Sequence, residues 1–338
     1  MKLIETVVLS ASLAFTITSA HAGATFDAVK GKGYVQCGLS TGTPGFSVAD
    51  SKGEWYGFDV DMCKAVAAAM FGDASKFRGT PLSPQQRFTA LQSGEIDLLT
   101  RTVTATMGRD TTLGLMSTGI NHYDSQGILV NKSLGIKNAA ELDGAAVCVQ
   151  TGSTTELNLA DWSRSQNLNL KTVVVADVQE GVRAFVGGRC DAFTSDKSQL
   201  ASIRTTLDKP AEYEILSDDL SKEPNGPMVR QGDQQWFNVV RWTLNAMLEA
   251  EEYGITSQNV DEMLASSNPN VQRILGVTGD LGQSAGLDNK WAYNVIKHVG
   301  NYGESFARTL GKDTPMNLER GLDAQWKDGG LMYGWPLR

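Results

Sequence analysis

The chain has 338 residues, of which 41% are hydrophobic and 20% are charged, and its formal net charge is -8. This composition is typical of a globular protein, and the sequence shows no low-complexity tract, long block of like charges or repeat period. A nucleic-acid partner requires a basic face that neutralises phosphates, so the negative charge argues against one. The length exceeds what one compact core usually holds, which favours two lobes.

The first 22 residues have the features of a secretory signal peptide. Lys2 precedes an apolar stretch over 7–17, and the segment ends in Ala20-His21-Ala22. A charged start, a short apolar centre and such an ending predict export and cleavage after Ala22. The apolar stretch is too short to span a membrane, and no later segment is apolar over about 20 residues. We therefore expect a mature chain that is soluble outside the cytoplasmic membrane.

Strand-like segments alternate with helical patterns through the first two thirds of the chain. This alternation predicts an α/β fold with largely parallel strands. The expected strands are 34–38, 96–99, 126–130, 145–150, 171–175 and 191–193. The expected helices are 59–71, 85–93, 154–165 and 179–187.

The last third of the chain is mainly helical. Apolar residues recur at helical spacing over 236–253 and over 291–310, and each segment is predicted to form a helix. The segment 217–228 contains two prolines, an asparagine and a glycine, which we expect to break any regular element. The tail 329–335, rich in glycine and aromatic residues, is expected to wrap a lobe without forming its own domain.

Motifs for enzymatic chemistry are not found in this sequence. His122 and His298 follow the leader without a neighbouring carboxylate and nucleophile motif. There is no Gly-x-Ser-x-Gly elbow, no Walker loop and no His/Cys metal spacing, so neither a cofactor nor a metal is expected. The four cysteines include no Cys-x-x-Cys pair, and in an exported chain they favour two structural disulfides over a metal site.

Several motifs resemble, in chain order, the periplasmic amino-acid-binding proteins of ATP-driven importers, solute-binding protein family 3. They are GFDVDMCKAVAAAM (57–70), an Arg-Phe helix with a Gly-x-x-Asp strand (87–98), Thr-x-Thr followed by Arg (102–109), Gly-Ser-Thr-Thr-Glu (152–156), and Gly-Arg-Cys-Asp followed by Asp196. Two further segments, KEPNGPMVRQGDQQW (222–236) and WAYNVIKHVGNYGE (291–304), resemble the general L-amino-acid-binding subgroup.

The resemblance implies a fold and a set of partners. The fold would be a two-lobed α/β periplasmic binding protein of type II, with a hinge and a discontinuous first lobe. Lobe one would comprise 23–124 and, with a helical extension and tail, 223–338; lobe two would be 125–222. The protein would be a periplasmic monomer that binds a free L-amino acid and docks on the permease subunits of an ABC importer. It would not be an enzyme.

A site for a free amino acid must supply opposite charges to a carboxylate and an ammonium, because unpaired buried ions are heavily penalised. The guanidinium of Arg109 can grip a carboxylate with two parallel hydrogen bonds, although on sequence alone it could be a solvated surface residue. The resemblance assigns Asp196 to the ammonium. Thr102 and Thr104 alternate on the segment before Arg109, so their side chains would face the same way if it is extended.

Other candidates surround this pair. Ser153 and Thr154 lie at the start of a predicted helix, where backbone N–H groups favour an anion, and this turn can equally be a simple N-cap. The resemblance adds a contact loop with three candidates, Ser40, Thr43 and Phe46. Because this loop is small, we expect a permissive pocket that accepts polar, acidic and several aliphatic amino acids. Arg87 and Arg101 could reach acidic or amide side chains, or could be surface ion-pair residues.

The lobes implied by the resemblance also suggest a cysteine pairing. Cys37 lies on the first strand and Cys63 on the following helix, whereas Cys148 and Cys190 lie at or beside strands of lobe two. We therefore predict the bridges Cys37–Cys63 and Cys148–Cys190, so that neither crosses the hinge.

An alternative function is a periplasmic enzyme of the same fold, similar to cyclohexadienyl or arogenate dehydratases.

Overall fold

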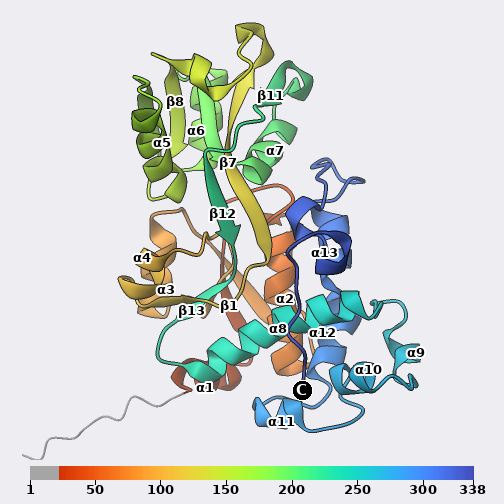
Figure 1. Ribbon diagram of the computed structural model, residues 1–338. Helices are drawn as coiled ribbons and strands as arrows, with labels where there is room; N and C mark the ends of the chain where they lie inside the picture. The colour runs from red at the N-terminus through yellow and green to blue at the C-terminus, as the bar shows by residue number, and fades with distance from the viewer. Residues whose placement is uncertain (1–22) are drawn as a thin grey trace, which may run out of the picture.

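Two sheets form the centres of two lobes, which Figure 1 shows one above the other. The computed structural model describes residues 23–338, so the predicted signal peptide and its cleavage after Ala22 lie outside the described residues. The first sheet has the order β4-β1-β5-β13-β6, with β1 (Val35–Leu39), β4 (Phe77–Pro81), β5 (Leu98–Leu99), β6 (Leu115–Ser117) and β13 (Met228–Arg230). The second has the order β11-β7-β10-β8-β9, with β12 also paired to β7: β7 (His122–Asn131), β8 (Ala146–Gln150), β9 (Lys171–Val175), β10 (Ala192–Asp196), β11 (Tyr213–Ile215) and β12 (Ser221–Asn225).

The strands β7 and β12 connect the two lobes. They pair antiparallel along the full length of β12, and Figure 1 shows both spanning the junction of the lobes in opposite directions, with β12 pointing down into the lower lobe. Since β13 follows β12 and returns to the first sheet, lobe one is built from two separate parts of the chain. The predicted boundaries near residues 124 and 222 fall within these two strands, and they stay predictions.

Helices cover both sheets. Those of lobe one are α1 (Ala24–Lys32), α2 (Phe58–Phe71), α3 (Gln86–Ser93), α4 (Met107–Thr111), α8 (Gln234–Glu252), α9 (Val260–Met263), α10 (Pro269–Ile274), α11 (Leu281–Ser284), α12 (Trp291–Val299) and α13 (Tyr302–Thr309). Lobe two has α5 (Thr154–Ser165), α6 (Val178–Val186) and α7 (Lys197–Thr205). Within the part of the chain that the structure describes, no helix is both long enough and apolar enough to cross a membrane.

The core of lobe one is centred on α2. This helix packs against α8 and α12. Of the apolar residues that helical spacing places on one face, Val60, Cys63 and Ala67 are fully buried, and Met70 and Phe71 are partly buried. Gly57, which precedes the helix, has φ 127°, and a Cβ atom there would lie 2.2 Å from the carbonyl oxygen of Phe46. Only glycine fits such a close backbone approach in this conformation, which explains the glycine of the 57–70 motif.

The structure corrects two expectations about the last third of the chain. The segment 291–310 is not one helix, because Gly300 (φ 91°) ends α12 and Asn301 starts α13 through a capping box with Glu304. The segment 217–228 contains two strands, β12 and β13, despite its prolines. Pro224 is tolerated because β12 pairs in a ladder only with β7, as an edge strand does.

The sheets are also mixed, which differs from the expectation of largely parallel strands. Parallel pairs join β1 to β4 and β5, and β8 to β9 and β10. All pairs made by β7 and β13 are antiparallel. β7 carries the chain into the second sheet, and β13 follows the return of the chain through β12 to the first sheet, so the direction of both strands follows from the crossings and not from a βαβ unit.

Both predicted disulfides are confirmed. Cys37 on β1 is bonded to Cys63 on α2, with 6.4 Å between the Cα atoms. Cys148 on β8 is bonded to Cys190, with 5.6 Å between the Cα atoms. Each bridge lies within one lobe, so neither restrains the motion of one lobe relative to the other.

Replacing both Cys148 and Cys190 by Ser should lower the free energy of unfolding by about 3–4 kcal/mol, because opening a loop of this length releases chain entropy in the unfolded state. Urea unfolding followed by circular dichroism measures the change. Wild-type protein with both bridges reduced should lose more stability than the variant. Equal stability of variant and oxidised wild type would contradict this account.

Candidate functional site

A cavity lies where the two lobes meet. Its volume is about 20 Å³, close to the space of a single water molecule, so a larger ligand requires the lobes to part or side chains to move. The lobes touch around it, for example through Gln85 Nε2, which donates to Thr151 Oγ1 (3.3 Å). The lining residues are Pro84, Arg87, Arg101, Thr102, Thr104, Gln150, Ser153, Thr154, Thr155, Ser195, Asp196 and Gln199.

Three buried guanidinium groups lie at or beside the cavity, and two of them, Arg87 and Arg101, line it. Arg87, Arg101 and Arg109 are 4%, 2% and 7% exposed, and none has a carboxylate oxygen within ion-pair distance among residues 23–338. The Nε atoms of Arg87 and Arg101 also have no hydrogen-bond partner there. Burial lowers the pKa of Arg101 and of Arg109 to about 10, and lowers that of Arg87 well below its ordinary value. Such unpaired buried cations favour an anionic ligand.

Arg109 takes part in the cluster without lining the cavity. Its Nη1 donates to the carbonyl oxygen of Thr104 (2.5 Å), and its guanidinium stacks on the ring of Phe88, 4.8 Å from the centroid. Arg87 lies 4.7 Å from the centroid of the same ring. The predicted contact of Arg109 with a ligand carboxylate therefore stays a prediction.

Asp196 supplies the opposite charge. It is the last residue of β10, not a loop residue, and its Oδ2 accepts a hydrogen bond from Asn225 Nδ2 (3.0 Å). Burial, together with the nearby carboxylates of Asp124 and Glu223, raises the pKa of Asp196 to about 8. A ligand ammonium would relieve both effects, because an opposite charge favours the ionised carboxylate.

The hydroxyl groups come from both lobes. Thr102 and Thr104 line the cavity as expected, but Thr102 has φ 44°, so the segment is not extended there. A β-branched residue rarely adopts this left-handed conformation, and such strain is concentrated at functional sites. On the facing lobe, the hydroxyl of Ser153 caps α5 by accepting from the N–H of Glu156 (3.1 Å), and the hydroxyl of Thr154 faces Thr104 at 3.2 Å.

The strand β12 contributes two residues that sequence reasoning missed, Glu223 and Asn225. Both are buried, and Asn225 holds Asp196 as described above. Residues two apart on a strand face the same side, so the alternation at 223 and 225 was the available signal. It was hidden because Pro224 suggested a break in regular structure.

The loop that was expected to contact the ligand has a different role in the structure. Ser40, Thr43 and Phe46 do not line the cavity: the hydroxyls of Ser40 and Thr43 bond to each other (2.5 Å), and Phe46 packs edge-on against Phe58 and His122. The same loop meets lobe two, since the carbonyl oxygen of Pro44 accepts from Ser202 Oγ (2.8 Å). Contact of these three side chains with a ligand stays a prediction.

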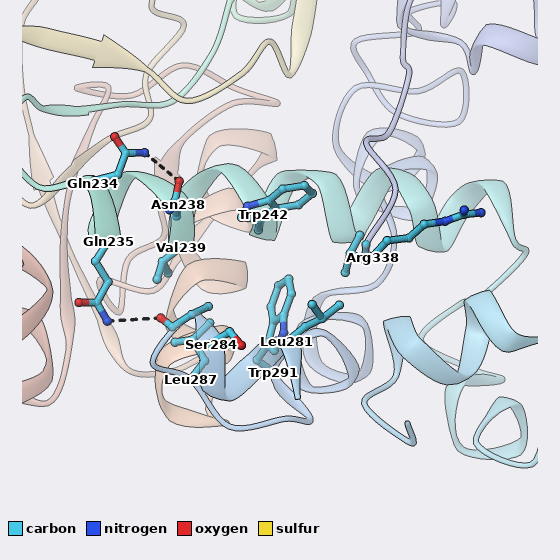
Figure 2. A pocket seen from close by; sticks show the side chains of 12 residues that line it. Gln234, Gln235, Asn238, Val239, Trp242, Leu281, Ser284, Leu287, Trp291 and Arg338 are labelled. Atoms are coloured by element: carbon cyan, nitrogen blue, oxygen red, sulfur yellow. Dashed lines mark hydrogen bonds between the residues drawn. The ribbon is translucent and has the colours of Figure 1, made fainter. Parts of the chain in front are cut away.

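A second, larger cavity of about 590 Å³ lies between α8, α11 and the C-terminal residues (Figure 2). Its amide side chains already have partners: Gln234 donates to Asn238 (2.9 Å) and Gln235 to the carbonyl oxygen of Ala285 (3.4 Å). The rest of its lining is mostly apolar, with the exposed Arg338 at the rim. It lacks the facing opposite charges of the cavity between the lobes.

Comparison with known proteins places this chain in a family. Residues 35–259 match the model of the bacterial extracellular solute-binding proteins, family 3. The chain is 51% identical over 339 residues to the general L-amino acid-binding periplasmic protein AapJ of Rhizobium johnstonii, covering 100% of this chain and 99% of that protein. It is 49% identical over 330 residues to the glutamate/glutamine/aspartate/asparagine-binding protein BztA of Rhodobacter capsulatus, covering 97% of this chain and 98% of the relative.

A solved structure agrees with both sequence matches. The periplasmic binding protein of an ABC transporter from Brucella ovis, with glutathione bound, superimposes with a TM-score of 0.92 at 52% identity, covering 94% of this chain and 100% of that chain. The fold is therefore that of the two-lobed type II periplasmic binding proteins. The chain belongs to the bacterial extracellular solute-binding proteins of family 3.

The pKa of Asp196 predicts that the ligand-free closed form is favoured at low pH. In the closed form this pKa is about 8, above the ordinary 3.8, so closure takes up a proton once water no longer solvates the carboxylate. The ratio of closed to open protein should therefore fall as the pH rises toward about 8 and then level off.

Small-angle X-ray scattering of ligand-free protein from pH 5 to 9 measures this ratio. The isosteric variant Asp196→Asn is the control, because it cannot titrate and should close to the same extent at each pH. The explanation fails if Asp196→Asn opens with rising pH as the wild type does.

Proposed function

We propose that this protein binds free L-amino acids between its lobes and delivers them to the permease subunits of an ABC importer. The observation that carries the proposal is the pairing of a buried cluster of unpaired guanidiniums with the buried carboxylate of Asp196 across one small cavity. A zwitterion supplies the missing partner to each charge, which converts a costly arrangement into a favourable one. The family membership supports the same conclusion.

The three guanidinium groups suggest which residue binds which group of the ligand. Arg109 would hold the α-carboxylate while Asp196 and Thr104 hold the α-ammonium. Arg87 and Arg101, whose Nε atoms have free N–H groups, would then take a carboxylate or amide on the side chain. The predicted broad range with polar and acidic ligands agrees with the names of the relatives AapJ and BztA.

Binding would proceed by closure of the lobes about β7 and β12. A ligand that first meets one lobe stabilises the closed form by the additional contacts it makes with the other, that is, by its differential affinity. The segments 23–124 and 223–338 would move as one lobe and 125–222 as the second. The protein would act as a periplasmic monomer, and the closed form would dock on the permease.

The alternative of a periplasmic dehydratase is tested separately. The cavity lining contains threonines, serines and arginines, which suit recognition of a zwitterion, and neither histidine nor cysteine. Incubation with amino acids and prephenate-like acids, followed by mass spectrometry, distinguishes the two functions. Ligand recovered unchanged supports transport, and a new product supports the enzyme.

Arg109→Ala and Asp196→Ala should each lower the affinity for every amino acid by about 30-fold or more, whatever the side chain of the ligand. Removal of one member of a buried charge pair typically costs roughly 2–5 kcal/mol of binding free energy. Isothermal titration calorimetry of ligand-stripped protein with L-glutamate, L-glutamine and L-alanine measures the loss. A loss by Arg109→Ala that depends on the side chain would reverse its assigned role.

Arg87→Ala should differ in kind from those two variants. If Arg87 contacts only the side chain of the ligand, its removal should lower the affinity for L-glutamate and L-glutamine far more than that for L-alanine. The α-carboxylate and α-ammonium, which all three ligands share, would remain bound. The same calorimetric panel decides this, with glutathione included because the similar structure was solved with it. A uniform loss for all ligands would show that Arg87 acts on the common groups.

A further inference from the structure

We propose that Glu223 is a positioning residue that directs the hydroxyl hydrogens of Thr104 and Thr154 away from the ligand, so that both oxygens can only accept hydrogen bonds from it. The inference rests on the proposed function and extends it. Its consequence is that the site selects an amine over a hydroxyl group of the same shape.

Glu223 is fully buried on β12, at the junction of the lobes. Its Oε2 accepts from Thr104 Oγ1 (2.5 Å), which belongs to lobe one, and from Thr154 Oγ1 (2.9 Å), which belongs to lobe two. Its Oε1 accepts from Ser221 Oγ (2.6 Å) and Asn158 Nδ2 (2.8 Å). Four neutral donors thus satisfy the carboxylate, which does not itself line the cavity.

The chemistry of a hydroxyl group then determines what the ligand meets. A threonine hydroxyl has one hydrogen and two lone pairs, and an ionised carboxylate can only accept. Hydrogen bonds to a charged acceptor are roughly twice as strong as neutral ones, so both hydrogens are directed to Glu223 and not to the neighbouring hydroxyl at 3.2 Å. Since both threonines line the cavity, only their lone pairs remain for a ligand.

The acceptors at this end of the cavity match an ammonium group. An ammonium has three donors, and Thr104, Thr154 and Asp196 are three acceptors. The hydroxyl of a 2-hydroxy acid has a single donor, so it leaves two of these acceptors without a partner, and buried unpaired groups are penalised. Thr104 and Thr154 come from different lobes, so this selection operates in the closed form.

Glu223→Gln provides the test, because the amide has nearly the same shape but places two donors where the carboxylate has only acceptors. A threonine hydroxyl that faces the amide NH₂ must turn its hydrogen toward the cavity. The affinity for L-glutamate should fall by about 30-fold, whereas that for L-2-hydroxyglutarate should fall less than about threefold. Isothermal titration calorimetry of wild type and variant with these two ligands measures the change in the ratio of the two affinities.

Two control variants show whether the effect passes through the hydroxyls. Ser221→Ala removes a donor from the other carboxylate oxygen and should leave the ratio of the two affinities unchanged. In a Thr104→Val and Thr154→Val background, Glu223→Gln should no longer change that ratio, because neither hydroxyl remains. Thermal melts of each variant establish that it is folded.

If Glu223→Gln lowers the affinities for both ligands equally, or lowers neither, the inference is overturned and Glu223 is a structural residue. If that variant does not fold, Glu223→Asp keeps the charge but withdraws the carboxylate by one methylene group. It should show the same amine-specific loss, and a uniform loss would overturn the inference. Wild-type protein that binds no L-amino acid would instead refute the proposed function itself.

Discussion

The burial of unpaired charge at the junction of the lobes is the constraint on which the rest of this structure depends. Arg87 and Arg101 are buried with no carboxylate within ion-pair distance in the described part of the chain, while Asp196 is buried with a pKa raised to about 8. Neither lobe could hold these groups in a closed arrangement at low cost without a zwitterion between them. In the proposed function, a zwitterion between the lobes offsets this cost, and ligand binding is thereby coupled to closure.

The crossing strands and the C-terminal part of the chain hold this junction in place. Asp323 lies 2.6 Å from Nδ1 of His122 at the start of β7 and accepts the N–H of Tyr123 (2.7 Å). Although burial lowers it, the carboxylates of Asp323 and Asp124 together hold the pKa of His122 well above its ordinary value. Tyr302 donates to the carbonyl oxygen of Asn121 (2.9 Å). The C-terminal part therefore packs directly on the start of a connecting strand.

The sequence pattern predicted those helices and strands in which apolar residues recur at the helix or strand period within one segment. The helix 154–165 and the strand 171–175 have the bounds that their periodicity indicated, because each buries one face of a regular repeat. The strand β12 could not be predicted in this way. Its conformation comes from pairing with β7, about a hundred residues earlier, and this long-range contact outweighs the local preference of Pro224.

The sequence by itself determined most of the elements and, through the resemblance, the disulfide pairs and several residues that line the cavity, such as Thr102, Thr104 and Asp196. Only the tertiary structure decided that Phe46 belongs to the core and that Glu223 lies behind the threonines. The physical reason is that residue type and spacing report which chemistry a side chain can perform. Its partner is set by the packing of strands and lobes that lie far apart in the chain.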